Sequence, residues 1–484
     1  MRRRGVLRLM ATTAIGFAIS PRRTLAQASA AGPEMVALCE YMSAARSRGL
    51  PAEVAEQAKH HILDTLSAMI SGSWLPPGRA AQRYIQASAG KGTATICGTA
   101  LTAAPVEAAL ANGVMAHADE TDDSNNAGRW HPGCAVVPAA LATVEELGAD
   151  GASLLNAVTL GYDIGTRIIL AMFGENAKAS YASSLATHSI AGTFGAAAAA
   201  CCVAGFDAQQ MRWALGYTAH QSSGTRAWQR DTDHIEKAFV FAGMPARNGV
   251  TSALLVKAGW TGVDDIFTGA DNFFATYAPK AEPGRLVEKL GERYDIALTD
   301  IKKWTVGSPI QAPLDGIEAI RGKHPFEAGQ VKRVTVRLAP PVAAVVDNRD
   351  IPDICLQHMV AVMLLDKTVS FQAAHDTARM RDPAALRERQ KVDLVRDEEL
   401  AKFLPVRVTL VEIELADGTR LTERVTAVRG TPRNPMTRAE VVDKARDLIA
   451  PVLGREISER LIGMVYAIEA VPDIRNLGGL LRRG

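Results

Sequence analysis

The segment HADETDDSNNAGRWHPGCA, residues 117–135, places two histidines, an arginine and four acidic side chains between two alanine-rich stretches of helical character. Histidine and carboxylate side chains exchange protons near neutral pH, and they also bind zinc and manganese. The segment therefore predicts either general acid–base chemistry or a metal site. A solvated loop without any chemistry has a similar composition, because Asp, Ser and Asn cap helices and satisfy turns.

A metal site in this segment would draw its ligands from His117, Asp119, Asp122, Asp123 and His131. Their spacing matches no established ligand signature such as H-E-x-x-H. The sequence also contains no Walker A loop, no G-x-G-x-x-G after a strand and no G-x-S-x-G elbow. These absences argue against nucleotide, dinucleotide and serine-hydrolase chemistry.

The composition is that of an ordinary globular protein, with 48% hydrophobic residues, 22% charged residues and a formal net charge of +2. No basic stripe with interleaved aromatic residues is present, so we expect no nucleic-acid partner. The length of 484 residues exceeds the limit of about 250 to 300 residues for one core, which predicts two lobes. Because the six cysteines form neither a C-x-x-C pair nor a disulfide framework, we expect them to be reduced and buried.

The first 28 residues have the features of a twin-arginine-like signal peptide. Arginines precede a short apolar run, and Ala26-Gln27-Ala28 resembles a cleavage site. The segment Arg3-Arg4-Gly5-Val6-Leu7-Arg8 resembles the motif read by the twin-arginine export system. We therefore expect cleavage near residue 29, a periplasmic protein, and no membrane attachment after cleavage.

Apolar residues recur at helical spacing through residues 34–279, which predicts a helical domain. In one segment, Val54, Ala58 and Ile62 fall on one face, and Gly72 is placed as the stop signal. Further along, Asp207 and Gln210 have the spacing of a capping box.

The pattern changes near residue 280, where two prolines precede a segment that alternates through Val334, Val336 and Leu338 with strand periodicity. Two further strands are predicted around Asp417-Gly418, a strong hairpin signal. Residues 435–484 return to helical spacing. The predicted fold class is thus mainly α, with an α+β lid over residues 285–434 inserted into a helical domain built from both ends of the chain.

Five segments in order, HADETDD, HPGCAVVPAALATVEELGADGASLLNAVTLGYDIGTRI, HSIAGTFGAAAAA, KAFVFAGMPARNGVTSALL and WTGVDDIF, resemble the MmgE/PrpD family. The family includes 2-methylcitrate dehydratase, cis-aconitate decarboxylase and iminodisuccinate epimerase. The resemblance covers about residues 34 to 475. It implies a helical domain with a lid, a homodimer, no metal or organic cofactor, and an active site between the lobes that transfers protons next to a substrate carboxylate.

The resemblance also implies roles for particular residues. Histidine suits the base and lysine the cation that stabilises an enolate-like anion, so the implied catalytic residues are His131, His188 and Lys237 with Glu120, Asp122 and Asp123. The residues implied to contact the substrate are Ser124, Arg129, Arg226, Arg247, Ser308, Gln311 and His358.

Several of these positions depart from the family pattern. Glu120 stands where relatives carry Asp, and Ser124 where they carry Thr. In the lid, Ser308 and Gln311 replace an Arg and a His, and His358 replaces a Tyr. Because a buried carboxylate needs a cationic partner, we expect 2-methylcitrate and cis-aconitate to be poorer substrates than a mono- or dicarboxylate.

The predicted function is therefore a cofactor-independent lyase of the hydro-lyase type, or a decarboxylase or isomerase, acting on a small carboxylic acid. Two alternatives remain. The first is an exported carboxylate-binding protein without turnover. The second is a metal-dependent hydrolase, which stoichiometric zinc or manganese in the purified protein would support.

The signal-peptide interpretation is tested by replacing both Arg3 and Arg4 with lysine. We expect the variant to stay in the cytoplasm, because the transport system reads the arginine pair. Fractionation followed by immunoblotting checks this, with the unmodified chain as control. Unchanged export of the variant would contradict the interpretation.

Overall fold

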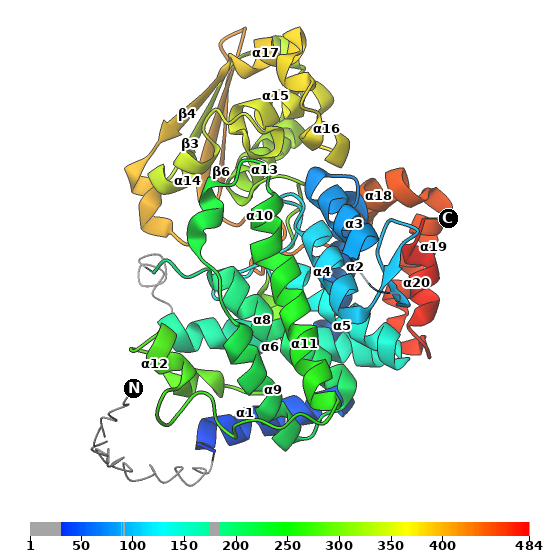
Figure 1. The fold of residues 1–484 in the computed structure, drawn as a ribbon. Helices are drawn as coiled ribbons and strands as arrows, with labels where there is room; N and C mark the ends of the chain where they lie inside the picture. Colours follow the sequence, from blue (N-terminus) through cyan, green and yellow to red (C-terminus); the bar gives the residue numbers. More distant parts are fainter. Residues whose placement is uncertain (1–30, 89, 91, 175–182, 484) are drawn as a thin grey trace, which may run out of the picture.

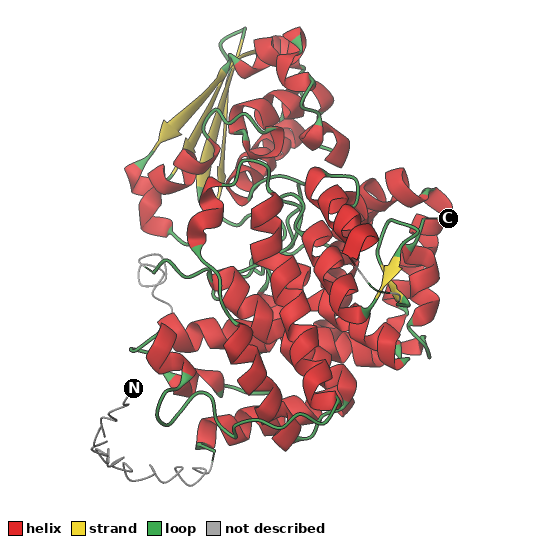
Figure 2. Cartoon of the chain, in the orientation of Figure 1, coloured by secondary structure: helices red, strands yellow, loops and turns green. Residues whose placement is uncertain are grey.

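The computed structural model describes residues 31–88, 90, 92–174 and 183–483, so the predicted signal peptide over residues 1–28 lies outside it. The chain forms a large helical domain and a smaller lid that contains a sheet (Figures 1 and 2). This confirms the predicted fold class, a mainly helical protein with a smaller α/β part.

The helical domain takes its helices from both ends of the described chain (Figure 1). Two short strands of two residues each, β1 (Ala94–Thr95) and β2 (Thr102–Ala103), form an antiparallel pair beside it. The helices are α1 (Pro33–Ala44), α2 (Ala52–Gly72), α3 (Pro76–Ser88), α4 (Pro105–Ala116), α5 (Gly133–Leu147), α6 (Gly151–Phe173), α8 (Thr187–Ala204), α9 (Ala208–Gln221), α10 (Ile235–Ala238), α11 (Met244–Lys257) and α12 (Phe273–Tyr277), and then α18 (Arg438–Leu453), α19 (Arg455–Tyr466) and α20 (Arg475–Leu481).

Small residues allow the central helices to approach closely. A Cβ atom on Gly161 of α6 would lie 2.8 Å from the carbonyl oxygen of Gly195 on α8, and one on Gly195 would lie 2.7 Å from that of Gly161. Helix α8 is apolar and long enough to cross a membrane, but 89% of it is buried inside the domain. It is therefore packed as a core helix.

Two local signals in the sequence meet different outcomes. The capping box forms at the start of α9, where Asp207 accepts from the Gln210 amide and the Gln210 side chain accepts from the Asp207 amide. Helix α2 ends at Gly72, as predicted, but the glycine is required there by packing and not by a helix cap. A Cβ there would lie 2.0 Å from the carbonyl oxygen of Met115, so glycine permits α2 to pack on α4.

The lid contains a four-stranded sheet in the order β4 (Val392–Arg396), β3 (Val331–Leu338), β5 (Thr409–Leu415) and β6 (Arg420–Val425). The β3–β4 pair is parallel and the other pairs are antiparallel. Val334, Val336 and Leu338 are buried, as the alternation predicts. The lid helices are α13 (Ser308–Lys323), α14 (Pro340–Val346), α15 (Leu356–Asp366), α16 (Phe371–His375) and α17 (Pro383–Arg389).

The two lobes have separate apolar cores. Leu286, Ile296 and Ile301 pack in the helical core, whereas Trp304 already belongs to the lid core. The chain therefore changes lobe at residues 302–303, later than the expected lid start at residue 285. The returning chain is held beside this crossing, because the Ile301 amide donates to the Gly430 carbonyl at 3.0 Å.

The contact at Gly430 yields a stability prediction. Gly430 has a φ of +94°, and a Cβ atom there would lie 1.8 Å from the Ile301 carbonyl oxygen. We expect Gly430→Ala to lower the free energy of unfolding by about 2 kcal/mol or more. Gly418→Ala is the matched control, since Gly418 has a φ of +90° with nothing within 4 Å. If urea unfolding shows that both variants lose the same free energy of unfolding, the close contact between Gly430 and Ile301 adds no constraint beyond the positive φ.

Candidate active site

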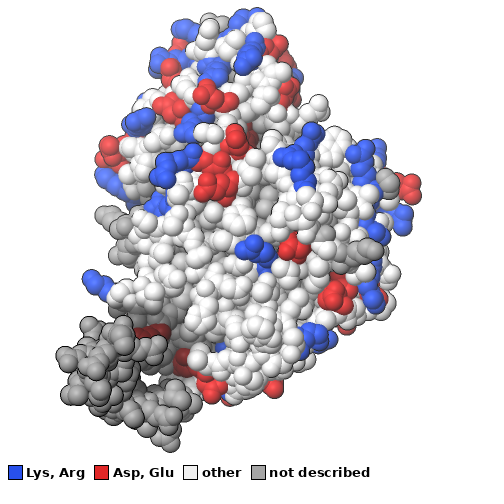
Figure 3. Space-filling model, in the orientation of Figure 1, with Lys and Arg blue, Asp and Glu red and all other residues white. Residues whose placement is uncertain are grey.

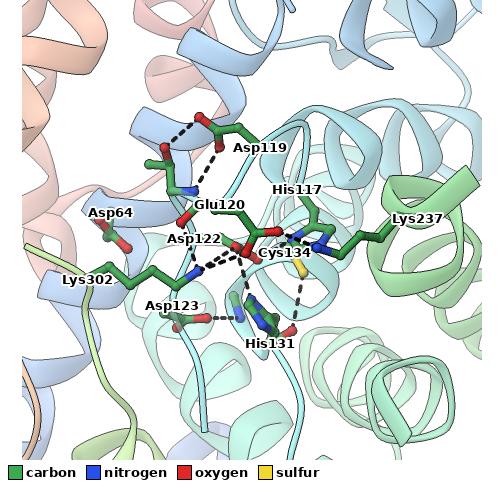
Figure 4. A network of polar contacts seen from close by, with 12 residues as sticks. Asp64, His117, Asp119, Glu120, Asp122, Asp123, His131, Cys134, Lys237 and Lys302 are labelled. Atoms are coloured by element: carbon green, nitrogen blue, oxygen red, sulfur yellow. Dashed lines mark hydrogen bonds and ion pairs between the residues drawn. The ribbon is translucent and has the colours of Figure 1, made fainter. Parts of the chain in front are cut away.

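The loop between α4 and α5 is organised around one buried carboxylate, that of Asp122 (Figure 4). Its Oδ2 atom lies 2.9 Å from Nδ1 of His117, and its Oδ1 atom lies 3.0 Å from Nδ1 of His131. Burial acts to raise the pKa of Asp122, but His117, His131 and Lys302 outweigh it and hold that pKa well below its usual range. Asp122 is therefore an ionised bridge between two imidazole rings.

Two lysines bring positive charge to the same place. Lys237 of α10 forms an ion pair with Glu120. Lys302, at the crossing to the lid, donates to the Glu120 carbonyl at 2.9 Å and lies 3.5 Å from Oδ1 of Asp122. Against the effect of burial, the two lysines hold the pKa of Glu120 well below its usual range. The site thus pairs anionic side chains with two cations that reach it from different segments (Figure 4).

An aromatic wall borders the histidines. The ring of Phe241 stacks on His188 at 3.8 Å and on His117 at 4.5 Å between ring centroids. Phe241 lies in a π-helical turn, Phe239–Gly243, and such turns occur often at functional sites. Trp228 packs edge-on against both His188 and Phe241. This wall fixes the ring planes of the histidines.

His131 and His188 are the histidines best placed for proton transfer. His131 directs Nδ1 at the ionised Asp122, and its other nitrogen has no partner among the described residues. The two ring centroids lie 5.5 Å apart. Burial, reinforced by His131 and His117, holds the pKa of His188 well below its usual range, so His188 is neutral. A neutral histidine beside one bound to a carboxylate is suited to moving a proton.

Asp123, expected to be catalytic, has a structural position instead. Its carboxylate accepts from Tyr162 at 2.6 Å, from Nδ1 of His61 at 2.8 Å and from the Gly133 amide at 2.9 Å. It ties the loop to α2, α5 and α6.

Three of the residues implied to bind substrate, one from the loop and two from the lid, line the same cavity, but not all of them are available to a substrate. Ser124, Ser308 and Gln311 all line a cavity of about 300 Å³, together with Lys302. The Gln311 amide, however, donates to the carbonyls of Trp304 and Val306 and accepts from the Trp304 amide. Gln311 therefore holds the start of the lid in shape.

The other residues implied to bind substrate lie on several different elements. Arg247 of α11 contacts the neighbouring Asn248, and Arg129 donates to the carbonyl of Gly174. Arg226 begins a short helical turn, Arg226–Arg230, near the aromatic wall. His358 is buried in the lid, and both its ring nitrogens lack a hydrogen-bond partner there. Burial lowers its pKa to about 4, so it is a neutral core residue.

Sequence reasoning missed three contributors to the site. Lys302 follows no motif, and His234 and His375 carry no pattern that separates them from surface histidines. His234 lies 5.2 Å from His117 between ring centroids, and burial lowers its pKa to about 3. His375 of the lid reaches Asp119. Only the folded chain brings these residues to the loop.

One group in the described residues has the spacing of metal ligands, namely His117, Asp122 and Cys134. Its chemistry is unfavourable for a cation. Both oxygens of Asp122 already face imidazole rings, and the Cys134 thiol bonds the His131 carbonyl. Burial and the charges of Asp122 and Asp123 raise the pKa of this thiol well above its usual value. All six cysteines are free and buried, as expected.

The fold and the site together define a two-lobe protein with a buried cluster of histidines, carboxylates and lysines at the seam of its lobes. Family comparison places it: the MmgE/PrpD N-terminal domain matches residues 36–286, and the MmgE/PrpD C-terminal domain matches residues 304–470. The chain therefore belongs to the MmgE/PrpD family.

Similar proteins with assigned names span almost the whole chain. A cis-aconitate decarboxylase-like protein, oryM of Aspergillus oryzae, is 25% identical over 95% of this chain and 99% of its own length. The cis-aconitate decarboxylase of Homo sapiens is 26% identical over 89% of this chain and 90% of its own length. That of Aspergillus terreus is 24% identical, over 92% and 95% respectively.

The position of Asp123 separates a structural from a catalytic role. We expect Asp123→Asn to lower the free energy of unfolding by about 2 kcal/mol, because it weakens three buried hydrogen bonds to a charged acceptor. Thermal and urea unfolding check this. Asp473→Asn, at an exposed pair near the C-terminus, is the control. A variant with unchanged stability and abolished turnover would restore the catalytic role.

Proposed function

We propose that the protein is a cofactor-independent lyase that acts on a small carboxylic acid by proton transfer next to a carboxylate. The observation that supports this best is the cluster around Asp122, where two histidines share one ionised carboxylate, Lys302 lies 3.5 Å from it, and Lys237 pairs with the nearby Glu120. The family relatives point to the same class of substrate.

The lysines differ in what they can bind. The side chain of Lys237 is 18% exposed, so a substrate carboxylate can reach it by sharing or displacing Glu120. The side chain of Lys302 is only 2% exposed and stays behind Asp122. In this proposal Lys237 binds the substrate, and Lys302 keeps the cluster in its ionised form. Preorganised cations of this kind stabilise negative charge that develops during the reaction.

The histidines carry the proton. Removal of water or of carbon dioxide from such an acid places an electron pair next to a carboxylate, and a proton must leave or reach carbon in the same sequence of steps. Because Asp122 holds Nδ1 of His131, the Nε2 atom is the position that can exchange this proton with the substrate. His188 supplies the second, neutral ring.

Decarboxylation is the first reaction to test, because the named relatives are cis-aconitate decarboxylases or resemble them. The expectation that tricarboxylates bind poorly rested on a lid without fixed cations. Three lid arginines, Arg407, Arg429 and Arg433, line the cavity that Ser308 and Gln311 also line, and Arg429 forms an ion pair with Glu440. Tricarboxylates therefore belong in the first panel of substrates.

The experiment uses the purified chain with cis-aconitate, 2-methylcitrate and a series of mono- and dicarboxylates, with products followed by NMR. We expect turnover of at least one acid, at a rate unchanged by EDTA. Binding of an acid without any product would favour the carboxylate-binding alternative. Activity that EDTA removes and zinc or manganese restores would favour the metal-dependent hydrolase.

The histidine assignment is tested by His131→Ala and His188→Ala. We expect each variant to lose at least about a hundredfold in kcat, because a positioned acid or base contributes about that much or more. His188→Ala should unfold at nearly the wild-type temperature, whereas His131→Ala should unfold at a lower temperature, because it removes one partner of the buried Asp122 carboxylate. His220→Ala, at an exposed position on α9, is the matched control. Near wild-type turnover in either active-site variant would contradict the assignment.

A further inference from the structure

The lid reaches into the active-site loop at one ion pair. His375, the last residue of α16, places Nε2 at 2.9 Å from Oδ2 of Asp119. Asp119 lies next to Glu120, whose carboxylate binds Lys237. The two side chains are largely buried, with 18% and 6% exposure. The pair therefore joins the two lobes directly beside the catalytic cluster.

The surroundings of His375 fix its protonation state. Its Nδ1 atom donates to the carbonyl of Phe371 at 2.8 Å, because a carbonyl can only accept. Nε2 lies at ion-pair distance from the Asp119 carboxylate, although it does not have hydrogen-bond geometry toward it. The ion pair requires both ring nitrogens to carry hydrogen, which is the imidazolium form. Helix α16 is held in place at its other end, where the Phe371 amide donates to Asp447 of α18 at 2.7 Å.

Asp119 connects His375 to the loop through hydrogen bonds with Thr121. Its Oδ1 atom accepts from the Thr121 amide at 2.9 Å, and its Oδ2 atom accepts from the Thr121 hydroxyl at 2.7 Å. The Thr121 carbonyl accepts in turn from Lys444 at 3.0 Å. Asp119 thus shapes the turn that presents Glu120 between Lys237 and Lys302.

We propose that His375 is a positioning residue, whose imidazolium holds Asp119 so that the loop turn carrying Glu120 is fixed only while the lid is closed. The link to the reaction rests on the proposed function, whereas the link to the loop does not. Closure of the lid and completion of the catalytic cluster are then one event, driven by a contact between the lobes.

The ion pair between His375 and Asp119 also makes the stability of the closed lid depend on pH. The titratable groups that act on His375 are Asp119 and Asp353, which lies on the neighbouring lid turn Pro352–Ile354. Burial acts to lower the pKa of His375, but these carboxylates outweigh it and raise the pKa to about 9. A raised pKa stabilises the closed state fully below the ordinary histidine value of about 6.5. This stabilisation is lost as the pH rises through about 9.

The test measures hydrogen exchange at the Thr121 amide, which is bonded to Asp119. At pH 7 we expect His375→Ala and Asp119→Asn each to speed this exchange by about tenfold or more, as the loss of a largely buried ion pair implies. The double variant should exchange no faster than the faster single variant, because both remove one interaction. His375→Gln, which keeps a neutral donor, should recover part of the protection.

His324→Ala is the matched control, since His324 is an exposed histidine of the lid. The exchange of the wild type should approach that of His375→Ala at pH 10, measured against this control at the same pH. In parallel, kcat for the acid identified as substrate should fall by about tenfold in His375→Ala, with a smaller change in KM.

Exchange at Thr121 that is equal in His375→Ala and His324→Ala, or additive effects in the double variant, would overturn the proposal. So would a kcat that is unaffected by faster exchange. If no acid is turned over at all, the proposed function fails, and the exchange measurements still decide whether His375 positions the loop.

Discussion

The arrangement depends on keeping the Asp122 carboxylate ionised in a place that water does not reach. An isolated carboxylate there would be strongly destabilised, because burial without partners favours the neutral form. The imidazole rings of His117 and His131 and the ammonium group of Lys302 supply the compensation. Each comes from a different part of the loop or from the lid crossing. The charge of the loop is therefore balanced by its own histidines and by a lysine at the crossing between the lobes.

This requirement explains why so much charge lies in one short segment of an otherwise apolar region. The surrounding helices pack closely through alanine and glycine and offer few polar groups, and charged side chains are sparse on the helical face seen in Figure 3. The polar groups of the loop therefore pair with one another or with side chains from other elements. The latter are Lys237 of α10, Lys444 of α18 and His375 of the lid. The seam between the lobes is the place where these segments can meet.

Local patterns in the sequence predict most of the secondary structure and the division into two lobes. Helical periodicity, the Asp207 capping box and the strand alternation through Val334 are consequences of burial and of backbone hydrogen bonds between near neighbours. The strand β4 was missed, because its five residues, VDLVR, are too short and too polar to stand out. The lid start was placed too early, because prolines mark a change of backbone conformation and do not show which core the following side chains join.

The site was harder to predict, because its geometry depends on contacts between distant residues. The loop and its histidines were visible in the sequence, and the structure brings His131, His188, Lys237, Glu120 and Asp122 together. Nothing local distinguishes Asp122, which bridges two rings, from Asp123, which anchors Tyr162 and His61. Likewise, His358 and His375 lie in similar lid helices, yet one faces the lid core and the other faces Asp119.

In the proposed function, this cluster moves a proton to or from carbon without a cofactor. The most direct measurement runs the reaction of metal-depleted protein with its acid substrate in heavy water and locates deuterium in the product by NMR. For decarboxylation, the first reaction to test, we expect one deuterium at the carbon next to the retained carboxylate, at a rate unaffected by chelator. A decarboxylation product without deuterium at that carbon, or one formed only after a metal ion is added, would show that the cluster does not protonate carbon by itself.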